Sequence, residues 1–278
     1  MPSTTTPRFT EALLKILRDF ADTQNGVLDQ AATACAESIA GGNLIHLFGS
    51  GHSVIPTLDA YPRYGSFVGL NPLTDPRVMW HNVLGPGGVR ELLWLERTEH
   101  YIDKFLEHEP LDAGDTLICY SHGGTNVAAI EAAMYARNRG LTTVAVTSSD
   151  SAKRPAKHSS GKKLGDVCDL MIDTGVPVQD ALIDIDGWDR PTGGSSTIVA
   201  TVASQELITR TAAICAQRGL VLPTFVSPTV PGADLTSNDE VFQAHAVYLH
   251  AARGRRFANP EVGAKAASGA EPKNPAQV

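Results

Sequence analysis

The regular alternation of short apolar segments with helical segments is the feature that most constrains the fold of this chain. The predicted strands cover residues 43–49, 66–70, 115–121, 142–148 and 169–174, and the predicted helices cover 9–40 (with a break near Asn25-Gly26), 53–63, 89–108, 125–140 and 195–219. Most of these strands are apolar along their whole length, as in a parallel sheet covered by helices on both faces. The alternation therefore predicts an α/β fold, and in such folds ligands bind at the carboxyl ends of the strands.

Composition excludes several classes of function. The 278 residues are 42% hydrophobic and carry a formal net charge of −7, which argues against nucleic acid and anionic lipid as partners. No run of about 18 apolar residues is present, and the N-terminus lacks the pattern of a signal peptide, so we expect no membrane partner. The four cysteines are scattered and none forms a CxxC pair, which is typical of buried thiols in a reducing, cytoplasmic protein.

The first predicted strand, "IHLF", runs directly into Gly49-Ser50-Gly51-His52-Ser53. Glycines let a backbone approach a ligand, and the N–H groups of a following helix suit an anion such as phosphate. A tight turn with a serine at the helix N-cap would give the same residues. Val54 stands where a dinucleotide-binding GxGxxG turn requires glycine, so a nucleotide site of that type is not expected.

The strand that ends at Ser121 repeats this pattern with His122-Gly123-Gly124-Thr125-Asn126, and the repetition favours a ligand site over a plain turn. The strand that ends near residue 148 leads into residues 150–164, "DSAKRPAKHSSGKKL", which bring five positive charges into an acidic protein. That segment is consistent either with part of an anion site or with a solvated loop.

At these residues the chain resembles the SIS (sugar isomerase) domain family. Its first loop, Gly-x-Gly-x-Ser, is matched by Gly49, Gly51 and Ser53. Its second loop, typically Ser-x-Ser-Gly-x-Thr, is matched at Ser121 and Gly124, whereas Gly123 and Asn126 replace the second serine and the threonine. The stretches "FGSGHS", "NPLTDP", "HSSGKKL" and "GVPVQD" are similar to those of UPF0309-type bacterial members, and the resemblance extends from about residue 10 to about residue 230.

The resemblance implies a three-layer α/β/α sandwich with a five-stranded parallel sheet of flavodoxin-like topology. It also implies a sugar phosphate or a related anionic sugar as ligand, no cofactor, and assembly into homodimers or homotetramers. We expect N-terminal helices in residues 1–40, the SIS domain in 41–230, and a C-terminal extension in 231–278. Its last part is low in apolar residues and is expected to be disordered. Family members include isomerases, a sugar-acid etherase and regulators that only bind.

The expected function is that of a phosphosugar-binding protein that interconverts an aldose and a ketose phosphate through an enediol. The alternatives are a non-catalytic sugar-phosphate sensor and a sugar-acid lyase or etherase. The expected substrate- and phosphate-binding residues are Gly49, Ser50, Gly51, Ser53, Ser121, His122, Gly124, Asn126, His158, Ser159 and Ser160.

The enediol reaction needs a base near carbon and a group that moves the hydroxyl proton. We expect Glu206 or Glu99 as the base and His52 as the second group. Glu206 shares an apolar helical face with Val202, although an ion pair with Arg210 would explain it equally well. Glu96 and Glu99 could both be surface acids of a helix at a subunit contact.

The remaining histidines and acids have other expected roles. His52 and His122 could hold a metal, but no third ligand has a compelling position, so no metal is expected. His81 is a further candidate that could act across an interface, and His46 is interpreted as a strand residue whose hydrogen bonds are met in the core. Asp180, Asp184 and Asp186 are interpreted as structural residues or ligands of sugar hydroxyls.

Overall fold

A computed structural model describes residues 8–79 and 87–258 of the chain. Within these residues, five strands form one parallel sheet with the order β2-β1-β3-β4-β5. The strands are β1 (Ile45–Gly49), β2 (Leu70–Leu73), β3 (Thr116–Tyr120), β4 (Thr142–Thr147) and β5 (Leu170–Asp173). The predicted α/β fold with a five-stranded parallel sheet is therefore confirmed.

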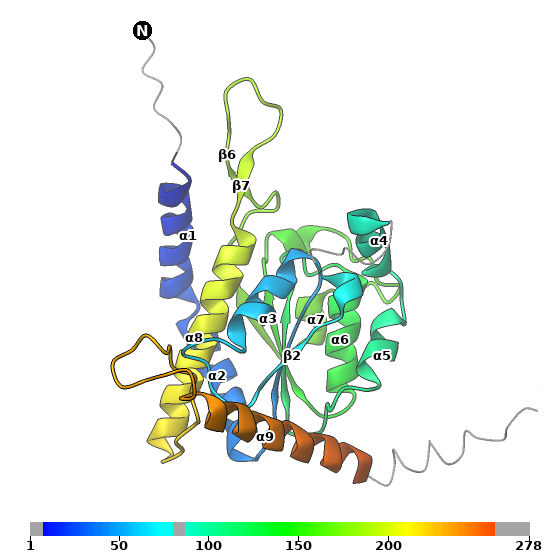
Figure 1. The fold of residues 1–278 in the computed structure, drawn as a ribbon. Helices are drawn as coiled ribbons and strands as arrows, with labels where there is room; N and C mark the ends of the chain where they lie inside the picture. Colours follow the sequence, from blue (N-terminus) through cyan, green and yellow to red (C-terminus); the bar gives the residue numbers. More distant parts are fainter. Residues whose placement is uncertain (1–7, 80–86, 259–278) are drawn as a thin grey trace, which may run out of the picture.

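Helices cover both faces of the sheet (Figure 1). One face packs against α1 (Phe9–Thr23), α2 (Asn25–Ala40), α3 (Ile55–Ala60) and α8 (Ser196–Gln217). The opposite face packs against α5 (Tyr101–Leu106), α6 (Val127–Arg137) and α7 (Leu164–Val167). Short 3-10 helices lie at His52–Val54, Pro76–Val78 and Ser151–Lys153.

The residues of strand β3 are apolar because both of its faces lie in the core. Ile118 and Tyr120 point into the core beneath α2 and α8, whereas Leu117 and Cys119 point into the core beneath α6. The buried hydroxyl of Tyr120 donates a hydrogen bond to Ser204 of α8 at 2.9 Å, so its polar atom is satisfied. The strand is therefore buried on both faces, as its sequence predicts.

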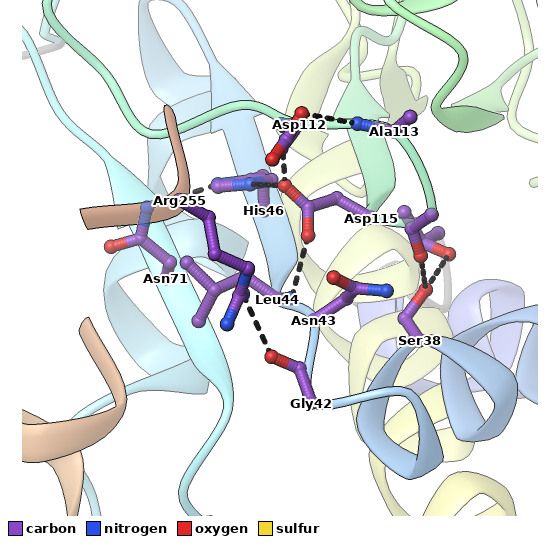
Figure 2. Close-up of polar contacts among 12 residues, drawn as sticks. Ser38, Gly42, Asn43, Leu44, His46, Asn71, Asp112, Ala113, Asp115 and Arg255 are labelled. Carbon is purple, nitrogen blue, oxygen red and sulfur yellow. Dashed lines mark hydrogen bonds and ion pairs between the residues drawn. The ribbon is translucent and has the colours of Figure 1, made fainter. Parts of the chain in front are cut away.

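A buried polar network ties strands β2, β1 and β3 together near their amino ends (Figure 2). The Asp115 carboxylate accepts hydrogen bonds from the backbone N–H groups of Leu44 and Asp112, each at 2.8 Å. Nε2 of His46 lies 3.0 Å from the same carboxylate, and its Nδ1 lies 2.9 Å from the Asn71 amide nitrogen. His46 is thus satisfied within the core, as its sequence position suggests.

The predicted helix over residues 89–108 is wrong, because the chain forms two helices there, α4 (Gly88–Leu95) and α5. The break occurs at His100, whose backbone adopts the left-handed conformation with φ of 67°. The backbone N–H of His100 donates to the carboxylate of Glu131 on α6 at 2.6 Å, which holds the break in place. The second strand lies at Leu70–Leu73 and not at 66–70.

Two elements after β5 have no counterpart among the predicted elements. An antiparallel hairpin of β6 (Ala181–Ile183) and β7 (Thr192–Gly194) projects beyond the sheet beside α1 (Figure 1). Helix α9 (Asp239–Ala258) crosses below the amino ends of the strands. On α9, the Tyr248 hydroxyl donates to the carbonyl oxygen of Asn43 at 2.8 Å, and Arg255 donates to that of Gly42 at 2.8 Å.

None of the helices in the described ranges has the length and hydropathy needed to cross a bilayer. The expected disorder of the last residues falls outside the described part of the chain, and so does His81. The division into residues 1–40, 41–230 and 231–278 stays a prediction.

Candidate functional site

A cavity of about 230 Å³ lies at the carboxyl ends of β1 and β3. Strand order changes direction between these two strands, because β2 lies on one side of β1 while β3, β4 and β5 follow on the other. Such a switch point is where open α/β sheets bind ligands. The predicted residues that line the cavity are Ser50, Gly51, His52, Ser53, Ser121, His122 and Asn126.

The two turns that line the cavity depend on glycine. A Cβ atom on Gly49 would collide with the carbonyl oxygen of Ser53, so only glycine permits the chain to fold back at the end of β1. Gly124 has a φ of 58°, and a Cβ atom there would lie 2.7 Å from the Thr147 hydroxyl. These two glycines shape the turns beneath the cavity and are not themselves among its lining residues.

Glu96 is the carboxylate of this cavity. It follows α4 directly, and only 4% of its surface is exposed. Its two oxygens accept hydrogen bonds from the Ser50 hydroxyl at 2.9 Å and from the Asn126 amide at 2.8 Å, so it bridges the two turns. Burial raises the pKa of the Glu96 carboxyl, and this effect outweighs the hydrogen bond from Ser50 and the nearby charges of Arg97 and Lys157.

Three cations surround the same space: Arg97, Arg154 and Lys157. The Lys157 ammonium donates to the Asn126 side-chain oxygen at 2.7 Å. Burial, followed by repulsion from Arg97, lowers the pKa of Lys157 despite the attraction of Glu96. With one carboxylate against three cations, the cavity has an excess of positive charge that suits an anionic ligand.

Two histidines line the cavity, one from each turn. Nδ1 of His52 lies 2.8 Å from the Thr197 hydroxyl, and Nε2 of His122 lies 3.1 Å from the Ser151 hydroxyl. Nδ1 of His122 is buried and has no hydrogen-bond partner within the described ranges. Burial lowers the pKa of both imidazoles, although the charge of Asp180 opposes it, so both are neutral at pH 7.

Asp180 has a structural role beside this site. Its carboxylate accepts hydrogen bonds from the backbone N–H groups of Ser195 and Ser196, at 2.8 and 2.6 Å, at the start of α8. Burial would raise the pKa of Asp180, but these backbone donors outweigh it and hold the pKa below its usual value. Asp184 and Asp186 are exposed in the hairpin.

The two acids favoured by the sequence lie elsewhere. Glu206 forms the ion pair with Arg210, at 2.9 Å, and its side chain is 41% exposed. Glu99 accepts hydrogen bonds from the backbone N–H and the hydroxyl of Ser159, at 2.6 and 2.8 Å. Neither carboxylate is among the residues that line the strand-end cavity.

Residues of the loop over 154–163 line two different cavities. Arg154 and Lys157 line the strand-end cavity, whereas His158 lines a second cavity between α5 and α6. The hydroxyl of Ser160 lies 2.8 Å from Nδ1 of His158. The predicted binding residues at 158–160 thus do not line the same cavity as the turns.

From the sequence, Glu96 is one of three acids considered beside Glu99 and Glu206, with a surface role as its alternative, and it is not the one favoured as the base. The signal that could have identified it is its place one helical turn after Leu92, which is 2% exposed, so that both side chains fall on one buried face. The same reasoning favoured Glu206, whose partner Arg210 is visible in the sequence. The partners of Glu96, Ser50 and Asn126, lie 46 and 30 residues away.

Comparisons with known proteins identify the family of this chain. The SIS domain family matches residues 8–148. A UPF0309 protein of Oceanobacillus iheyensis is 30% identical over 239 residues, which cover 86% of this chain and 95% of the relative. A UPF0309 protein of Streptomyces coelicolor is 32% identical over 226 residues, which cover 81% and 89%.

Among solved structures, the chain is similar to a phosphoheptose isomerase from Neisseria gonorrhoeae, with a TM-score of 0.49 and 14% identity over 75% of this chain and 95% of that one. It is also similar to a phosphoheptose isomerase from Francisella tularensis, with a TM-score of 0.48 and 13% identity over 73% and 94%. The matched family and the curated relatives show that this chain belongs to the SIS domain family and, within it, to the UPF0309 proteins.

Proposed function

We propose that the strand-end cavity binds a phosphorylated sugar and that the protein interconverts its aldose and ketose forms through an enediol. The observation that carries this proposal is the buried Glu96 carboxylate, which faces a cavity with three cations and two neutral histidines. A carboxyl whose pKa is raised by burial is suited to accept a proton near neutral pH.

The phosphate has donors on two sides of the cavity. The hydroxyls of Ser53 and Ser121 come from the two glycine turns, and Arg154 and Lys157 come from the loop after β4. The hydroxyl of Ser50 already donates to Glu96. Charge-assisted hydrogen bonds of this kind are the strong ones in phosphate recognition. A bound dianion would also offset the burial and the repulsion from Arg97 that together lower the pKa of Lys157.

Two proton transfers complete the reaction. Glu96 removes the proton from the carbon beside the carbonyl group, the electron pair forms the enediol, and the proton returns to the neighbouring carbon. His122, whose Nδ1 has no partner in the described structure, moves the proton between the two hydroxyl oxygens. His52, which the sequence favoured for this step, lies in the same cavity and is the alternative.

The test begins with a ligand. Sugar phosphates of different length and stereochemistry are screened by thermal unfolding, since a ligand at 100 times its Kd adds about 2.7 kcal/mol of stability. Each ligand is then incubated with the protein in heavy water, and the carbon-bound proton is followed by NMR. We expect that proton to be lost and that Glu96→Gln abolishes the loss without abolishing binding.

The matched variants separate the possible bases. Glu206→Gln and Glu99→Gln test the two positions that the sequence favoured, and Glu37→Gln on α2 is an exposed control. Loss of exchange in Glu206→Gln but not in Glu96→Gln would overturn the assignment. Ligand binding with neither proton exchange nor product would indicate a non-catalytic sensor. Elimination or ether cleavage of a sugar acid would instead indicate a lyase or etherase.

A further inference from the structure

A second cavity, of about 470 Å³, lies between α5 and α6 and is separate from the strand-end cavity. Five of its lining residues carry imidazole or carboxylate side chains. The Glu107 carboxylate pairs with Lys104, and the other four are His100, Asp103, Glu131 and His158. We propose that these residues bind a divalent transition-metal ion, with His100, Asp103 and Glu131 as the central ligands and His158 as the fourth.

Glu131 is a buried carboxylate with one oxygen that a cation could compensate. It lies within α6, and only 4% of its surface is exposed. Its Oε1 accepts the backbone N–H of His100 at 2.6 Å, but its buried Oε2 has no hydrogen-bond partner in the ranges that the structure describes. An ionised oxygen in that position is unfavourable unless an opposite charge compensates it.

The distances between ligand atoms suit coordination better than they suit hydrogen bonding. Nδ1 of His100 lies 3.5 Å from Oδ2 of Asp103 and 3.9 Å from Oε1 of Glu131. Ligands at about 2.1 Å from a tetrahedral zinc ion are about 3.4 Å apart, whereas a good hydrogen bond is about 2.7–3.2 Å. One ligand atom from each of the three residues lies within 4.8 Å of the others.

His158 approaches from the loop after β4. Its Nε2 lies 3.9 Å from Oε1 of Glu131, and its side chain is 10% exposed. Its Nδ1 accepts a hydrogen bond from the backbone N–H of Ser160 at 3.1 Å and lies 2.8 Å from the Ser160 hydroxyl. Binding of a metal at Nε2 therefore requires the proton to move to Nδ1, which then donates to the Ser160 hydroxyl and gives up the contact with the Ser160 N–H.

The donor set points to the kind of ion. Two imidazoles and two carboxylates, without a thiolate, suit zinc and its first-row neighbours, whereas calcium and magnesium prefer oxygen ligands alone. The sequence predicts no metal, because its cysteines form no CxxC pair and no third ligand has a compelling position beside His52 and His122. His100 and Asp103 are three residues apart, but Glu131 and His158 join them only through the fold.

The test uses the full chain, stripped with a chelator and dialysed against Zn²⁺ alone, with the bound metal counted by mass spectrometry. We expect one zinc ion per chain and an affinity at least tenfold lower in both His100→Ala and Glu131→Gln. His100 has a side chain that is 80% exposed, so its replacement tests the site even if Glu131→Gln fails to fold. His108→Ala, at an exposed histidine just after α5, is the control.

Cobalt provides a second measurement, because its visible absorption reports the ligand set directly. We expect the Co²⁺ spectrum to change in His158→Ala and to stay unchanged in His108→Ala. Zinc affinity that is unaffected by His100→Ala and Glu131→Gln would overturn the proposal. Loss of zinc in His52→Ala or His122→Ala, with retention in His100→Ala, would assign the metal to the strand-end cavity and would also overturn it.

Discussion

Replacement of Asp115 is expected to destabilise the sheet from its amino ends. The carboxylate is 1% exposed and accepts three hydrogen bonds, from the backbone N–H groups of Leu44 and Asp112 and from Nε2 of His46 (Figure 2). In Asp115→Ala all three donors lose their acceptor inside the core. Breaking a buried charged contact of this kind costs about 3–5 kcal/mol of folding free energy.

Asp115→Asn is expected to cost less, because the network can reverse its direction. The new amide oxygen still accepts from Leu44, and the amide N–H can donate to His46 if the imidazole moves its proton to Nδ1. That proton can then be donated to Asn71, whose side-chain amide flips. Only the N–H of Asp112 remains without an acceptor, at a cost of about 1–3 kcal/mol.

The two costs are measured by urea unfolding at pH 7, with Asp112→Asn as a control that leaves the Asp115 carboxylate in place. The ¹⁵N chemical shifts of the His46 ring report which nitrogen carries the proton. We expect the proton on Nε2 in the wild type and on Nδ1 in Asp115→Asn. Equal losses of stability in the two variants would refute the reversal. A loss below about 1 kcal/mol in Asp115→Ala would refute the whole account of the network.

Three further predictions concern the strand-end cavity. Because burial raises the pKa of Glu96 above 4.5, the native state holds more protons than the unfolded state just above that pH, and stability falls as pH rises through this window. Glu96→Gln should therefore flatten the pH dependence of urea unfolding and be more stable than wild type at pH 7; a parallel profile would contradict this. Ser53→Ala should weaken sugar-phosphate binding by about 1–3 kcal/mol in calorimetry, and an unchanged Kd removes Ser53 from the site. Lys157→Met should weaken it by about 1.5–3 kcal/mol and reduce its dependence on salt, whereas an unaltered salt dependence would place the phosphate elsewhere.

The positions of most strands along the chain were predictable, because buried parallel strands are continuous apolar runs between turn residues. "LICY" and "VAV" lie within β3 and β4 as expected. The order of the strands in the sheet could be obtained only through the resemblance to a family. Strand β2 was predicted too early in the sequence, because Phe67 and Val68 are apolar whereas the true strand contains the polar Asn71. Asn71 belongs to the strand because it pairs with His46 of β1.

The site was less predictable, because its key contacts are distant in the sequence. Residues 96–100 continue a helical pattern, and nothing local indicates that Glu131 will hold His100 in a left-handed conformation. Glu96 and Glu206 are similar in their local sequence, since each follows an apolar residue by one turn. What separates them is the tertiary structure around each carboxylate, and periodicity carries no information about it.

Helix α9 has a consequence for how the protein folds. Its contacts with the turn before β1 join residues 205 and 213 positions apart, from Tyr248 to Asn43 and from Arg255 to Gly42. Closing so long a loop early is entropically unfavourable, while β1, β3 and β4 can pair through shorter connections. We therefore expect helix α9 to dock late onto a sheet that is already assembled, and to detach first when the native protein opens locally.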